Sequence, residues 1–344
     1  MKIAIDAMGG DNAPEIVIKG VIDYLKEQRF RDMLKIVLVG KERIIKKELK
    51  RAGFDPEESI EIVAAKEEIS MKEQFLSYWR RREQTSIKKG VDLVKKGFAQ
   101  AMISAGNTGA VMAISKNTLG NLKGIERPAL ALTLPTPRGS SLLLDAGANV
   151  DSKPKNLVQF ALMGKVFLEN VYGIDNPKIA LMSIGEEEIK GNDLTKKTFN
   201  MLKSLNLNFI GNVEGSDVYS GEADLIVTDG FTGNVALKVS EGVVEAMESM
   251  LEKEIGRRIL SRAGFFLLKS SMRRVRKKMD YAEYGGALLL GINGLIIIGH
   301  GKSNAKAIKN AIYMGKRFIT ENVLEKITFE IDKVQSVLKE LNYV

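Results

Sequence analysis

The stretch MISAGNTGAVMA, residues 102–113, places small and polar residues between apolar flanks: Ser104, Gly106, Asn107, Thr108 and Gly109. The apolar residues before this cluster predict a strand and those after it a helix, so the cluster marks a βα junction. Glycine and asparagine tolerate positive φ, which makes an ordinary turn one interpretation. An anion site is the other, because small residues let several backbone N–H groups converge where a helix begins.

The same alternation of strand, loop and helix continues along almost the whole chain. Apolar runs predict strands at 2–8, 35–39, 60–64, 101–104, 129–134, 141–145, 178–183, 208–211, 224–228, 287–290 and 295–298. Helical patterns lie between them, for example at 15–26, 43–51, 108–119, 154–171 and 303–320. This order is typical of a largely parallel sheet covered on both faces. We predict one α/β/α domain of two intimate lobes over residues 1–344.

Loops rich in Gly, Asn, Asp, Ser and Thr follow six of the predicted strands. They read DAMGGDNAP, SAGNTGA, DAGANVDSKP, SIGEEEIKGND, TDGFTGN and GHGKSNA. In parallel α/β sheets, ligands bind at the carboxyl ends of the strands. We therefore expect all six loops to converge on one edge of the sheet and to form the functional site there.

Composition excludes several kinds of chemistry. The 344 residues include no cysteine and one histidine, His300, so disulfides, thiolate nucleophiles and Cys- or His-rich metal sites are excluded. The N-terminal KIAID lacks the apolar core of a signal peptide. The apolar stretch 285–299 is broken by Gly and Asn and predicts two buried strands rather than a membrane span. We expect a cytoplasmic protein.

Positive charge is concentrated in one segment. Between Lys253 and Lys278 lie ten basic residues and one acid, Glu254, a local excess equal to the net charge of +9 on the whole chain. We predict a projecting, basic, amphipathic helical hairpin over 243–280. This hairpin has two interpretations. It packs as an ordinary helix pair on the body or on a second subunit, or it contacts an anionic membrane or an acidic partner. Aromatic residues are sparse, so we expect no nucleic-acid partner. The residues of this hairpin that are expected to contact the membrane or the acidic partner are Arg262, Phe265, Phe266, Leu267, Lys269, Arg273 and Arg274.

Several familiar motifs are absent. GHGKS (299–303) lacks the first glycine of a P-loop, because that position is Ile296. No G-x-G-x-x-G follows a strand, and there is no G-x-S-x-G elbow. His300 is followed four residues later by Asn304 and five later by Ala305, so the His-x4-Asp pattern of glycerolipid acyltransferases is missing. His300 could transfer a proton or make an ordinary hydrogen bond, and both interpretations remain open.

The charged loop GEEEIKGN also has two interpretations. It is a solvated turn at a helix start, or Lys190 is a point charge that holds a phosphate. A metal site from Glu186, Glu187 and Asp229 has unspecific spacing, so we expect neither a metal nor a cofactor.

Taken together, the motifs resemble the PlsX-type phosphate acyltransferases of bacterial phospholipid synthesis. Seven ordered stretches between residue 3 and about residue 312 carry the resemblance: IAIDAMGGDNAPE, LVKKGFAQAMISAGNTGAVMA, LLLDAGANVDSKP, GEEEIKGN, FIGNVEGSD, VTDGFTGNVALK and GINGLIIIGHGKSNAKAIKNAI. The resemblance implies transfer of a fatty acyl group from acyl-[acyl carrier protein] to inorganic phosphate. It also implies a fold like that of phosphotransacetylases and isocitrate dehydrogenase, a homodimer, and peripheral attachment to the inner face of the cell membrane.

The resemblance and the loop chemistry together assign roles as a hypothesis. Lys190, Asn107 and His300 are the expected catalytic residues. The expected phosphate and thioester contacts are Asp6, Asp11, Asn12, Ser104, Gly106, Thr108, Asp145, Asn149, Glu187, Asn192, Asp229, Thr232, Asn234, Ser303 and Asn304. Because phosphate is itself the nucleophile, a chain without cysteine can perform this acyl transfer.

Some positions depart from the family pattern. The stretch 69–87 has Gln74 where a proline is usual, and Leu288 and Leu295 also replace common prolines. We therefore carry no role over to 71–82. Two alternatives remain beside the leading function: a phosphotransacetylase-like enzyme acting on short acyl-coenzyme A, and a noncatalytic scaffold recruited to membranes by the basic hairpin.

Overall fold

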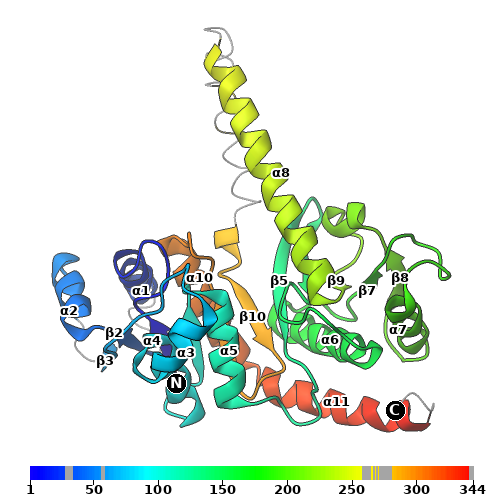
Figure 1. Cartoon of the computed structure of the whole chain (residues 1–344), viewed down its shortest axis with the longest axis horizontal. Coiled ribbons are helices and arrows are strands. Elements are labelled where there is room, and N and C mark those ends of the chain that lie inside the picture. The colour runs from blue at the N-terminus through cyan, green and yellow to red at the C-terminus, as the bar shows by residue number, and fades with distance from the viewer. Residues whose placement is uncertain are drawn as a thin grey trace.

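One eleven-stranded sheet forms the centre of the protein (Figure 1). The computed structural model describes residues 1–27, 34–55, 59–257, 265, 268, 270 and 281–340. The strand order is β3-β2-β1-β4-β11-β10-β5-β6-β9-β7-β8, and most neighbouring pairs are parallel. The predicted class, a mixed and mostly parallel sheet with helices on both faces, is confirmed.

All eleven predicted strands are present, with small shifts at their ends. They are β1 (Lys2–Asp6), β2 (Lys35–Gly40), β3 (Ile60–Ala64), β4 (Ala101–Ser104), β5 (Ala129–Thr136), β6 (Gly139–Leu144), β7 (Ile179–Met182), β8 (Phe209–Val213), β9 (Leu225–Val227), β10 (Ala287–Leu290) and β11 (Leu295–Ile298). Most are short and fully buried, which is why continuous apolar runs identified them.

The helices confirm the predicted segments and add others. They are α1 (Glu15–Glu27), α2 (Glu42–Arg51), α3 (Phe75–Arg81), α4 (Ser86–Lys95), α5 (Thr108–Leu119), α6 (Pro154–Phe167), α7 (Asp193–Lys203), α8 (Gly230–Arg257), α10 (Ala305–Thr320) and α11 (Val323–Glu340). A π-helical turn, Leu168–Tyr172, continues α6 to about where the sequence predicted its end.

Two hydrophobic clusters lie on the two faces of the sheet, because side chains alternate along each strand. Ile3 and Ile5 of β1 pack in one cluster with α1, α6, α7, α10 and α11, while Ala4 packs in the other with α4 and α5. Each loop at a strand end therefore leads into a helix that is anchored by its own apolar face.

The direction of the strands changes in the middle of the sheet. β5 and β6 form an antiparallel hairpin, so β6, β9, β7 and β8 run opposite to β3, β2, β1, β4 and β11. The expectation that all six loops leave one edge is therefore wrong. The loops after β1, β4 and β11, here called the first loop group, leave one edge, and those after β6, β7 and β9, the second loop group, leave the other.

Helix α8 rises out of the body between the two halves of the sheet (Figure 1). A row of exposed apolar side chains follows its length: Phe231, Val235, Val239, Val243, Met247, Met250 and Leu251. The predicted hairpin 243–280 thus starts inside α8. Phe265 and Leu268 are described and exposed, whereas Arg262, Phe266, Leu267, Lys269, Arg273 and Arg274 lie outside the described residues.

Candidate active site

The first loop group is closely packed. Asp11 N donates to Gly301 O at 2.9 Å, and Gly299 N donates to Ser104 O at 2.8 Å, so the loop after β11 contacts the other two. A Cβ atom at Gly9 would lie 2.6 Å from Asp6 Oδ2 and 2.7 Å from Gly106 N. Only glycine permits this approach, which explains a glycine in the first loop.

Asp6 connects the loops after β1 and β4 through a buried hydrogen bond. Its Oδ2 accepts a hydrogen bond of 2.7 Å from Ser104 Oγ, which in turn accepts one of 3.1 Å from Gly106 N. Burial raises the pKa of Asp6, and hydrogen bonds from Ser104, Ser86 and Met8 oppose that effect. Asp6 and Ser104 are each 1% exposed. Both are predicted substrate contacts, and their hydrogen bond joins the loops after β1 and β4.

Asn107 caps α5 and is also tied to a distant segment. Its Oδ1 accepts from Ala110 N at 3.0 Å, while its Nδ2 donates to Met71 O at 3.1 Å. The side-chain amide of Asn107, which is predicted to donate to the reacting oxygen, thus forms hydrogen bonds at both its oxygen and its nitrogen. Thr108 and Gly109 are exposed residues in the first turn of α5, where backbone N–H groups have no acceptor within the helix.

The segment around Met71 covers the first loop group. A Cβ atom at Gly301 would lie 2.5 Å from Met71 Cε, so the methionine side chain rests on the loop after β11. No sequence pattern predicts that this segment, 71–82, lies at the site. Only the contacts of Asn107 and Gly301 reveal its position.

The N-terminus of α10 lies at the end of the loop after β11, in the first loop group. Asn304 caps it by accepting from Ala307 N at 2.9 Å, and His300 Nδ1 accepts from Lys302 N at 3.1 Å. An accepting Nδ1 leaves the proton of neutral imidazole on Nε2. Ser303 is 6% exposed, and its Oγ has no hydrogen-bond partner among the described residues. A buried hydroxyl in this state indicates a place for a polar ligand.

The second loop group is organised by Asp145. Its Oδ1 accepts from the backbone N–H of Leu130 at 3.0 Å, Gly147 at 3.0 Å and Ala148 at 2.8 Å. Its Oδ2 accepts from the N–H of Asn149 at 2.9 Å and from the Nδ2 of the same residue at 2.8 Å. Burial raises the pKa of Asp145, against these hydrogen bonds. Asp145 and Asn149, both predicted substrate contacts, are buried, and the hydrogen bonds between them fix the loop after β6.

Other predicted residues of the second group cap helices or lie exposed. Thr232 N and Oγ1 donate to Asp229, and Asn192 accepts from Thr195 N at the start of α7. Lys190 is exposed, and no described residue forms an ion pair with its Nζ. Of the other predicted contacts, Asn234 has its side chain beside Gly147, and the carbonyl of Glu187 accepts a hydrogen bond from Asn212 Nδ2.

Two features relate the loop groups despite their opposite edges. Neighbouring strands of a sheet are rotated by about 20–25°. Strands β4 and β6 are four steps apart, so they are rotated by roughly 80–100° relative to one another. In addition, α8 begins in the second group, and its Glu245 lies 3.6 Å from Lys302 of the first. Asp11 and Asn12 are exposed at the mouth of the first group.

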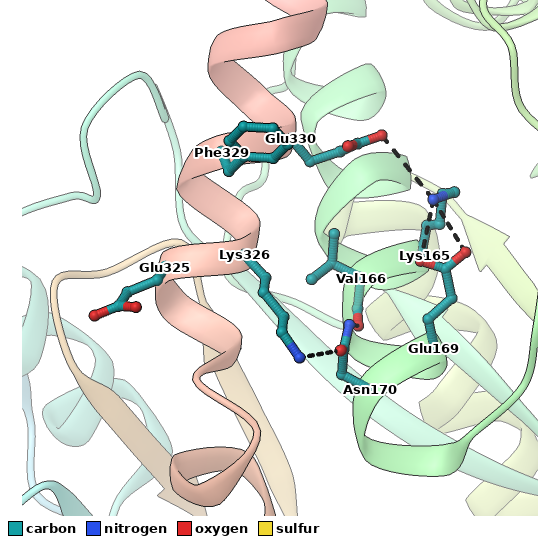
Figure 2. Close-up of a pocket in the computed structure, with 8 residues that line it drawn as sticks. All are labelled: Lys165, Val166, Glu169, Asn170, Glu325, Lys326, Phe329 and Glu330. Carbon is teal, nitrogen blue, oxygen red and sulfur yellow. Dashed lines mark hydrogen bonds and ion pairs between the residues drawn. The ribbon is translucent and has the colours of Figure 1, made fainter.

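Two clefts lie on the helices that cover the sheet, one away from both loop groups and one beside the second group. One, of about 360 Å³, separates α6 from α11, where Lys165 lies between Glu169 and Glu330 and Lys326 bonds Asn170 (Figure 2). It contains none of the predicted site residues. The other lies between α6 and α7. Within the described ranges, no group of three or more His, Asp or Glu side chains could hold a metal ion, and no helix there is long and apolar enough to cross a membrane.

Comparison with known proteins places this geometry in a family. Residues 1–326 match the family described as "Fatty acid synthesis protein". The phosphate acyltransferase of Thermodesulfovibrio yellowstonii is 48% identical over 340 residues, which cover 97% of this chain and 95% of that protein. The phosphate acyltransferase of Heliobacterium modesticaldum is 48% identical and covers 98% of this chain and 100% of its own length.

Solved structures match in fold. A phosphotransacetylase from Streptococcus pyogenes has a TM-score of 0.63 at 18% identity and covers 93% of this chain and 94% of its own. A branched-chain phosphotransacylase from Enterococcus faecalis has a TM-score of 0.55 at 16% identity, and the match covers 92% of this chain and 98% of that protein. The phosphotransacetylase-like fold expected from the sequence is therefore confirmed. The chain belongs to the fatty acid synthesis protein family, and its activity is that of an acyltransferase.

Proposed function

We propose that this protein transfers a fatty acyl group from acyl-[acyl carrier protein] to inorganic phosphate. The relatives named phosphate acyltransferase support it over almost their whole length. The observation that carries the chemistry is the meeting of two helix N-termini in the first loop group. A Cβ atom at Gly299 would lie 3.1 Å from both Ala105 Cβ and Ser303 Oγ, so the unpartnered hydroxyl faces the loop that leads into α5.

The reaction needs no enzyme nucleophile. An oxygen of HPO₄²⁻ attacks the thioester carbonyl, the C–O bond forms and the C–S bond breaks. The proton of the phosphate ends on the departing sulfur, so acyl phosphate and the free thiol balance the equation. In this proposal the N–H groups that begin α5 and α10 hold the phosphate and the developing oxyanion. The Nε2–H of His300 donates a hydrogen bond that positions the phosphate, and Lys190 supplies positive charge from the second group.

The test is a trapping assay. The purified protein is incubated with palmitoyl-[acyl carrier protein], with and without phosphate, and acyl phosphate is trapped by hydroxylamine as the hydroxamate. Phosphate-dependent hydroxamate is the expected result. If phosphate makes no difference with a folded protein, the proposed reaction is wrong.

A phosphotransacetylase-like reaction with short acyl-coenzyme A is the second candidate. The similarity to solved phosphotransacetylases favours it only through the shared fold. Substituting acetyl-coenzyme A for the carrier thioester separates the two, because a long-chain enzyme should lose most of its rate with that donor. The noncatalytic scaffold has no support from the acyltransferase relatives.

Helix α8 and the basic segment after it also suggest how the protein assembles and where it binds. The exposed apolar row on α8 suits a helix pair between two copies, and the basic segment after it suits an anionic membrane. We therefore propose a cytoplasmic homodimer that touches the inner face of the membrane peripherally. Substituting Val239 and Met247 by Glu, followed by light scattering and liposome flotation, should dissociate the dimer; an unchanged dimer with lost flotation would assign the row to the membrane instead.

A further inference from the structure

A basic cavity of about 570 Å³ separates the first turns of α6 from those of α7. The two helices pack side by side at the β8 side of the sheet (Figure 1). Lys153 and Lys155 line the cavity from α6, and Lys197 lines it from α7, opposite a single acid, Glu126. None of these residues belongs to the predicted site.

The cavity retains an excess of positive charge. Glu126 Oε1 lies 3.1 Å from Lys155 Nζ, and its Oε2 accepts from Asn156 Nδ2 at 3.0 Å. Burial acts to raise the pKa of Glu126, but Lys155, Asn156 and the nearby charge of Lys153 outweigh that effect and hold the pKa below its ordinary value. The acid is therefore ionised and already matched by Lys155. No described carboxylate lies within ion-pair distance of Lys153 or Lys197.

The position of the cavity connects it to the second loop group. Lys153 directly precedes α6, at the end of the loop that Asp145 organises. Lys197 lies one turn into α7, which follows the loop of Lys190. The partial positive charge at the start of α6 adds to that of the lysines. A partner bound here would lie beside the loops and leave them open.

The character of the lining favours a protein partner over a small ligand. Lys153, Lys197 and Glu126 are exposed, and Lys155 is half-buried, so the charges form an open rim. Small-ligand sites instead enclose their ligand and fix it with convergent polar groups. An open rim of long, flexible ammonium groups suits electrostatic capture of a complementary surface.

We propose that this rim, Lys153, Lys155 and Lys197, docks the acidic face of the acyl carrier protein. The proposal rests on the proposed function and adds to it the surface that recognises the donor. The carrier binds over α6 and α7. From there its thioester-bearing arm reaches the phosphate that the first loop group holds. Recognition of the carrier and reaction of the thioester are thereby assigned to different residues.

The double variant Lys153→Glu/Lys197→Glu tests this assignment, because it leaves the Lys155–Glu126 pair intact. We expect KM for palmitoyl-[acyl carrier protein] to rise at least about tenfold at low salt, with a smaller difference at high salt. KM for palmitoyl-pantetheine, the same thioester without the protein, should stay unchanged. Lys47→Glu/Lys50→Glu on α2, at the β3 side of the sheet, is the control with the same change in charge.

Titration of labelled holo-carrier by fluorescence anisotropy decides the docking independently of turnover. Weaker binding by the α6–α7 variant alone supports the proposal. Equal binding by that variant and wild type, or equal losses in both double variants, would overturn it, as would a KM increase shared by palmitoyl-pantetheine. A wild-type protein that binds the carrier but produces no hydroxamate would refute the proposed reaction and not the docking surface.

Discussion

Asp6, the last residue of β1, and Asp145, which directly follows β6, are both buried, at 1% and 0% exposure. Their hydrogen bonds differ. Asp6 accepts from the hydroxyl of Ser104, which lies 98 residues away in the chain, and so joins two loops. Asp145 accepts mainly from the backbone of its own loop, Gly147 to Asn149.

The difference teaches that similar polar loops can depend on different interactions. The first group is an assembly of loops, and its geometry depends on contacts between them. The second group contains a locally rigid loop fixed by one carboxylate. We therefore expect substitutions in the first group to change activity more than stability, and substitutions at Asp145 to change stability most.

Replacing Asp145 should have the largest effect. Asp145→Ala leaves four backbone N–H groups without their acceptor, two of them buried and two part-buried, which should lower the free energy of unfolding by about 3–5 kcal/mol. Urea denaturation followed by circular dichroism measures it. A loss below about 1 kcal/mol would show that the loop keeps its shape without the carboxylate, and the contrast with Asp6 would disappear.

Asn107→Ala should act mainly on activity. Loss of the cap on α5 costs about 1 kcal/mol of stability. Loss of the hydrogen bonds to the Met71 segment displaces the first loop group and should lower kcat/KM at least about tenfold. Asn192→Ala removes the corresponding cap of α7 and should cost similar stability with a smaller loss of rate. Equal rate losses in both variants would remove the distinction between the groups.

The pH dependence of stability should reveal the buried Asp6. Because burial raises its pKa above the ordinary 3.8, the folded chain binds more protons than the unfolded chain between pH 3.8 and the folded pKa. The contribution of Asp6 to the free energy of unfolding therefore falls as pH rises through this window. The wild-type value minus that of Asp6→Asn should decrease from pH 4 upward in urea titrations, and a difference that grows with pH would contradict the assignment.

Ser303→Ala should have the smallest effect on stability. Its hydroxyl has no partner among the described residues, so the free energy of unfolding should change by less than about 0.5 kcal/mol. KM for phosphate should nevertheless rise several-fold if the hydroxyl binds phosphate. An unchanged KM would assign the phosphate to α5 rather than to α10.

The strands and many of the helix starts were predictable because their signals are local. Buried strands such as β11 are short apolar runs, and Asn107 and Asn304 lie where an N-cap residue belongs. The site was predictable as a set of loops but not as an arrangement. The Met71 segment was missed because its role depends on a side chain 36 residues away in sequence, with no periodic signal to mark it.

The sequence by itself determined the alternation of elements, the absence of a cysteine nucleophile and the family, because composition and ordered motifs are properties of the chain alone. Only the tertiary structure decided that the six loops form two groups, that Asp6 and Asp145 support loops from below, and that Lys153 and Lys197 face one cavity. The physical reason is that strand direction, burial and charge proximity arise when distant segments pack together. The β5–β6 hairpin reverses half of the sheet, and no local pattern reports that reversal.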